Sequence, residues 1–185
     1  MITKEDAIAL LTQYIKNERM LYHCYATEAV MRALARRLGQ DEEKWGIAGL
    51  LHDLDLDLID GNLTVHTHET AKILDGISID PEIIDAIKMH NEDAWDMKRN
   101  TVFHHALAAG ETITGMIAAT ALVYPDKKLA SVKAKSVTKR MKEKAFAASV
   151  NRDTIMECEK LGIPLDEFAE ICLQAMKEIS DQLGL

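Results

Sequence analysis

Residues 49–55 read GLLHDLD, a histidine and an aspartate side by side within an apolar stretch. Burying a polar side chain without a partner costs several kcal/mol, roughly 2–7 for a neutral group and more for a charge. If this stretch lies in the core, His52 and Asp53 therefore need partners from elsewhere in the chain. The remaining sequence indicates which residues supply them.

Apolar residues recur at spacings of three and four along most of the chain, and no run alternates as a strand does. This periodicity predicts an all-α protein. Local signals such as the Thr3–Asp6 capping box, Gly39 and Asp80-Pro81 mark helix ends. We expect helices from Thr3, from Asn17 to Leu38, from Asp41 through GLLHDLD, over HTHETAKILDG (66–76), from Pro81, from Val102 to Tyr124, and after Asn151 and Pro164, with a loop over 93–100.

Length and composition predict a single cytoplasmic domain over residues 1–185. A chain of 185 residues can bury about 70% of its unfolded surface. The net charge of −8 argues against binding to nucleic acid or to an anionic membrane. The three cysteines show no paired spacing, which is typical of a reducing compartment. The longest apolar run, 115–124, is shorter than the roughly 20 residues of a membrane span.

Four of the expected helices each carry a metal-binding type of side chain on a face that should be apolar. His52, for example, shares its face with Trp45 and Ala48 and, one turn further on, with Leu56 and Ile59. One such histidine alone is more often a core residue bonded to a backbone carbonyl. Four of them together with Asp53 indicate a metal site suited to zinc, iron or manganese. The four residues are His23, His52, His90 and Glu111.

These residues, in this order, resemble the HD superfamily of metal-dependent phosphohydrolases. His66 and His90 resemble the members with two metals, and the register of HTHETA selects His66 over His68. The resemblance covers about residues 17–124. It implies a compact multi-helix bundle, to which this chain adds C-terminal helices over about 126–185. The chain departs from the family at Glu111, where aspartate is usual.

The resemblance also implies a ligand set and a reaction. His23, His52, Asp53 and Glu111 would hold one divalent ion, and Asp53 would bridge to a second ion completed by His66 and His90. Two ions of iron, manganese or zinc, about 3.5–4 Å apart, would hold a bridging hydroxide for attack on phosphorus. His52 and Asp53 are thus assigned as catalytic residues. The expected partner is a nucleotide or another small phosphorylated metabolite.

The pairing of His52 with Asp53 has a geometric explanation if both lie on a helix. Adjacent helical residues point about 100° apart, so His52 would serve one ion while Asp53 reaches between both. By the same geometry His68 lies about 200° from His66 and cannot face the same ion. One of the acids Asp55, Asp57 and Asp60 could hydrogen-bond a metal-binding histidine.

Six further residues are candidates for contact with the substrate. Three lie near the expected ligands: His68, Asn91 and His104. The others come from 127–144, which has eight basic residues and one acid within an acidic protein. Such a run is most often a solvated helix face, but it could also steer a phosphorylated substrate. The candidates there are Lys135, Lys139 and Arg140.

Three functions are compatible with these patterns. The first is hydrolysis of a phosphate ester. The second is a di-iron oxygenase, because some HD proteins with a similar ligand set cleave C–C or C–P bonds with oxygen. The third is a non-catalytic sensor that binds metal and nucleotide, for which Glu111 is the only support. We rank them in this order.

Overall fold

Two helices of 21 residues, α2 (Glu18–Leu38) and α6 (Val102–Leu122), form the centre of the computed structural model, which describes residues 2–60 and 62–185. Asn17 begins α2 by accepting a hydrogen bond from the Arg19 amide, and Gly39 ends it with φ 65°. The Thr101 side chain likewise accepts from the His104 amide at the start of α6. Polar caps therefore set the ends of both central helices.

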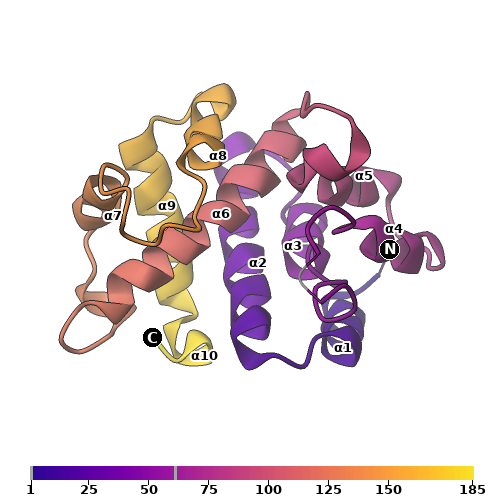
Figure 1. Cartoon of the computed structure of the whole chain (residues 1–185), viewed down its shortest axis with the longest axis horizontal. Coiled ribbons are helices and arrows are strands. Elements are labelled where there is room, and N and C mark those ends of the chain that lie inside the picture. Colours follow the sequence, from indigo (N-terminus) through magenta and orange to yellow (C-terminus); the bar gives the residue numbers. More distant parts are fainter. Residues whose placement is uncertain (1, 61) are drawn as a thin grey trace.

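The other helices lie on two sides of this central pair (Figure 1). One side contains the segments that precede α6 in the sequence: α1 (Lys4–Tyr14), α3 (Glu42–Leu51), α4 (His68–Asp75), α5 (Pro81–His90) and the 3₁₀ helix η1 (Glu92–Trp95). The other side contains η2 (Leu129–Ser131), α7 (Ala134–Arg140), α8 (Arg152–Met156), η3 (Glu157–Leu161), α9 (Leu165–Glu178) and α10 (Ser180–Leu183).

The fold is all-α, as the periodicity predicts: the described ranges contain no strand. Within the same ranges, no helix combines the length and apolar character needed to cross a membrane. The hydrophobic core includes residues from α1 through α10, and the single domain stays a prediction.

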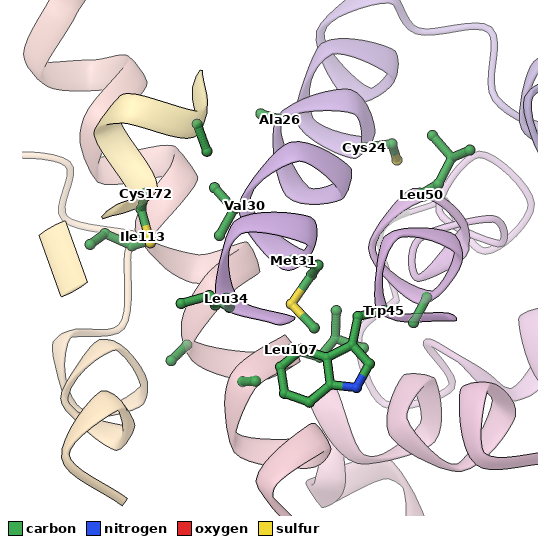
Figure 2. Packing of buried hydrophobic residues seen from close by; sticks show 14 of the residues in the cluster. Cys24, Ala26, Val30, Met31, Leu34, Trp45, Leu50, Leu107, Ile113 and Cys172 are labelled. Carbon is green, nitrogen blue, oxygen red and sulfur yellow. The ribbon is translucent and has the colours of Figure 1, made fainter. Parts of the chain in front are cut away.

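The core surrounds α2 on both sides (Figure 2). Cys24 lies between α2 and α3, and Val30 lies between α2 and the C-terminal helices. Close contact between α2 and α3 depends on Gly49, because a Cβ atom there would lie 2.8 Å from the backbone oxygen of Thr27. Cys24 is a packing residue of this interface.

Two expected helix boundaries were wrong, and both affect the site. Helix α3 ends at Leu51, so His52 is its C-cap and Asp53 begins a series of turns. Helix α4 begins at His68, so His66 precedes it. Apolar spacing continues through both segments although the chain turns. The helical angle used above does not apply to His66 and His68, because Thr67 between them has φ 79°. His52 itself keeps helical dihedral angles, with φ −62° and ψ −30°. Part of the expected loop over 93–100 is η1, and α6 ends at Leu122.

Candidate metal centre

Six nitrogen and oxygen donor atoms, from five residues, converge where α2, α5 and the segments around α3 and α4 meet. In a first group, Nε2 of His23 and Nε2 of His52 are 3.1 Å apart. They lie 3.4 and 3.2 Å from Oδ2 of Asp53. These three side chains offer donors close enough to hold one ion.

A second group uses the other oxygen of the same aspartate. Nε2 of His66 and Nε2 of His90 are 3.0 Å apart and lie 3.1 and 3.5 Å from Oδ1 of Asp53. These donors are also close enough to share one ion. Asp53 thus presents one carboxylate oxygen to each pair of imidazoles.

Two of the four histidines are oriented by the backbone of their own helices. Nδ1 of His52 lies 2.8 Å from the carbonyl oxygen of Gly49, and Nδ1 of His90 lies 2.7 Å from that of Ile87. A carbonyl can only accept, so Nδ1 carries the proton in both rings. Their Nε2 atoms are left with lone pairs that face Asp53.

The other two histidines are oriented by side chains. Nδ1 of His66 lies 2.7 Å from Oδ1 of Asp55, so Asp55 is the acid of the turn that bonds a histidine of the centre. Nδ1 of His23 lies 2.9 Å from Oγ1 of Thr114. The Thr114 hydroxyl donates to the Glu111 carbonyl at 2.6 Å, which leaves its oxygen to accept from His23. Sequence reasoning missed Thr114, because its role depends on where α2 meets α6.

This arrangement fits divalent cations. When every ring is neutral and carries its proton on Nδ1, two Nε2 lone pairs face one another at 3.1 Å in the first group and at 3.0 Å in the second. Two acceptors cannot hydrogen-bond each other, and a cation between them would satisfy both. Imidazole nitrogens with a carboxylate suit zinc, iron and manganese. Second partners at Nδ1 are typical of histidines that bind metal.

The protonation states of the cluster also suit a cation. Burial lowers the pKa of both His23 and His90 to about 4, so both rings are neutral at pH 7. Burial opposes charge on His66 too, but Asp53 and Asp55 raise its pKa to about 9. The pKa of Asp53 is well below its ordinary value despite burial, because imidazoles surround it. A bound cation would take the place of the proton on His66.

Glu111 lies at the edge of the first group. Its Oε2 is 3.8 Å from Nε2 of His23, farther than the other donors. Burial raises the pKa of the Glu111 carboxyl to about 7. The Thr112 hydroxyl donates a hydrogen bond to its second oxygen, Oε1. That Glu111 is a metal ligand stays a prediction.

The candidates His68, Asn91 and His104 for substrate contact have different surroundings. Asn91 lines the cleft of the centre and donates to the carbonyl oxygens of Leu63 and His66 at 2.9 and 3.1 Å. His68 instead stacks on Trp95 with ring centroids 4.1 Å apart. His104 lies 2.7 Å from Asp85 and lines a different cavity.

The three basic candidates do not line the cleft. Lys135 and Lys139 are exposed on α7. Arg140 pairs with Glu143, and its guanidinium lies 4.4 Å from the centre of the Phe146 ring. Any effect of these side chains on a substrate would act over distance.

The cleft over the centre, about 420 Å³, has a second wall that comes from the C-terminal part of the chain. That wall consists of Ser149, Val150, Asn151 and Thr154. Arg152 holds it in place by donating to the carbonyls of Ala147 and Val150 at 2.7 and 2.6 Å. Of these wall residues, the sequence indicated only Asn151, and only as the start of a helix. The polar wall was therefore not predicted.

Comparison with known proteins agrees with this geometry. Residues 20–123 match the family model of the HD domain, which is more than half of the chain. Neither the curated proteins nor the solved structures searched gave a significant match. The matched range includes all six predicted ligands, from His23 to Glu111. The chain is therefore a member of the HD domain family.

Proposed function

We propose that this protein is a metal-dependent hydrolase of a small phosphate ester. The observation that carries the proposal is the placement of Asp53, whose two oxygens each face a separate pair of imidazoles. When bound there, two divalent ions would supply an activated water and offset negative charge on the phosphoryl oxygens. Membership of the HD family supports the same reaction class.

The residues of the chain have distinct parts in this proposal. His23, His52, His66 and His90 would hold the ions through Nε2, and Asp53 would bridge them. Ser149, Thr154 and the amide of Asn151 line the cleft opposite and can bind the ester. The Asn151 side-chain oxygen caps α8, which leaves its amide N–H groups for a ligand.

Long-range attraction by the exposed Lys135 and Lys139 and the half-buried Arg140 is a further part of the proposal. A triple glutamine variant should show a raised KM whose dependence on salt is flatter than that of the wild type, because salt screens distant charges. Identical KM values for variant and wild type at every salt concentration would show that these residues form only a solvated face.

A di-iron oxygenase is the second candidate, because four imidazoles around one bridging carboxylate also suit iron. Oxygen consumption by the iron-loaded protein in the presence of substrate would favour it. The sensor function would require metal and nucleotide binding without turnover.

The proposal is tested by phosphate release from a panel of phosphomonoesters and phosphodiesters. Protein loaded separately with Mn²⁺, Fe²⁺ and Zn²⁺ should release phosphate or product from at least one ester. Asp53→Ala should abolish the reaction. Asp75→Ala is a matched control, since Asp75 is an exposed residue at the end of α4. Equal rates in both variants, or no reaction with any metal, would refute the proposal.

A further inference from the structure

A second cavity, of about 460 Å³, lies beside the metal centre between α2, α6 and the C-terminal helices. Its walls include His23 and Gly115, and these two residues also line the cleft of the centre. Its size is within the range of small-molecule sites in proteins, about 300–1,000 Å³. The two cavities therefore adjoin at these residues.

The chemistry of this second cavity differs from that of the metal cleft. Its polar groups are few: Arg19 is exposed, Tyr22 is half-buried, and the Thr114 hydroxyl is already bonded to His23 and to the Glu111 carbonyl. The remaining walls are mostly aliphatic side chains. These are Ala26, Ala118, Leu122, Met176, Leu183 and Leu185.

We propose that this cavity binds the organic part of the substrate and that this part is an apolar alkyl or aryl group. The proposal rests on the function proposed above, with the phosphoryl group at the metal centre and His23 as the shared wall. Burying apolar surface against aliphatic walls is favourable. A nucleobase would bury hydrogen-bonding edges, and leaving these without partners is costly. The cavity thus favours phosphate esters of apolar alcohols over nucleotides.

Binding of alkylphosphonates, which are not hydrolysed, tests this independently of turnover. We would titrate methylphosphonate and butylphosphonate into the full-length, Mn²⁺-loaded protein by calorimetry. Each buried methylene should lower Kd by about fourfold, so butylphosphonate should bind about 50-fold tighter. The Kd of adenosine monophosphate should not be lower than that of methylphosphonate by a comparable factor.

Variants locate the effect within the cavity. Ala118→Phe fills the space, and Leu122→Asn removes apolar surface from a side chain that is 54% exposed and therefore tolerant of change. Both should reduce the ratio of the two Kd values, and circular dichroism confirms that each is folded. Val123→Phe is the matched control, because Val123 is 55% exposed at the end of α6 and is not part of the cavity wall. It should keep the wild-type ratio.

Hydrolysis of methyl and butyl phosphate, measured in parallel, separates the two proposals. If butylphosphonate binds no tighter than methylphosphonate while the esters are hydrolysed, the cavity is not a subsite and the hydrolase function stands. If the preference is present and is lost in Ala118→Phe, the cavity is an apolar subsite. Absence of ester hydrolysis in that case would overturn the hydrolase function alone.

Discussion

Each histidine of the centre has a hydrogen-bond partner at Nδ1, and for His66 that partner is Asp55 at 2.7 Å. Asp55 is fully buried, and it also accepts a hydrogen bond from the Thr70 amide. It therefore fixes both the tautomer and the orientation of His66. Loss of such a partner typically weakens metal binding by about 10–100-fold.

Asp55→Asn should accordingly weaken the second ion by about this factor and leave the first ion in place. Competition with a chromophoric chelator measures both affinities. Asp57→Asn is the matched control, because Asp57 accepts from the backbone amides of Lys16 and Asn17 instead. If the two variants bind both ions equally well, Asp55 does not position His66.

Glu111 should bind the first ion, although its Oε2 lies 3.8 Å from His23 Nε2. Glu111→Gln should then weaken that ion, since a neutral amide is a poorer ligand for a hard cation. Glu111→Asp should preserve or raise activity, because it restores the residue that is usual in the family. Full metal content and wild-type activity in Glu111→Gln would show that Glu111 is not a ligand of the first ion.

At the scale of helices, the contact between α2 and α3 determines where His52 lies. Gly49 has no side chain, so the Thr27 carbonyl can approach it closely. The carbonyl oxygen of Gly49 itself accepts the hydrogen bond that orients His52. Gly49→Ala should lower the free energy of unfolding by about 1–3 kcal/mol, because α3 must shift away from α2. Metal content should fall with it.

Urea unfolding of the metal-free protein measures the free energy of unfolding of Gly49→Ala, and elemental analysis measures its metal content. Gly76→Ala is the control, because a Cβ atom at Gly76 would lie 3.4 Å from its nearest neighbour and the residue has φ −78°. Wild-type stability in Gly49→Ala would show that the two helices can adjust without cost.

Helix ends were predictable from sequence where the signal is local. Asn17, Gly39 and Asp80 cap their helices as expected, because caps act over three or four residues. The ends near His52 and His66 were not predictable, because no cap residue marks them and the apolar spacing continues.

The ligand set could be proposed because its residue types are unusual on apolar helix faces. The polar wall over the cleft could not, because it depends on contacts between distant segments. A Cβ atom at Gly115, for example, would lie 3.3 Å from the Val150 side chain. Such a contact between α6 and the segment before α8 leaves no periodic pattern in the sequence.

At the scale of the whole molecule, a partly buried ion cluster joins the C-terminal part to the HD segment. Glu157 of η3 lies 2.9 Å from Arg99 and 2.6 Å from His105. Arg99 also donates to the carbonyl of His90 at 3.2 Å. The cluster therefore connects the C-terminal helices to a residue of the metal centre.

This cluster should make the fold sensitive to acid. Burial alone would raise the pKa of Glu157, but Arg99 and His105 lower it below its ordinary value. A carboxylate with a depressed pKa stabilises the fold above its ordinary pKa of about 4.3, and this contribution is lost as the pH falls through the depressed value.

Unfolding free energies measured from pH 7 down to pH 3 should therefore decline more steeply in the wild type than in Glu157→Gln. Glu167→Gln serves as a control, since Glu167 pairs with Arg37 at the surface. Parallel pH profiles for wild type and Glu157→Gln would show that the cluster contributes no acid sensitivity.

The most direct test of the bridged centre is the number of metal ions per chain, measured by elemental analysis after anaerobic loading. The wild type and His68→Ala should each bind about two ions, and His66→Ala about one. Asp53→Ala should bind none with comparable affinity, although it remains helical by circular dichroism. Full metal content in Asp53→Ala, or equal loss in His66→Ala and His68→Ala, would contradict a centre in which Asp53 joins two histidine pairs.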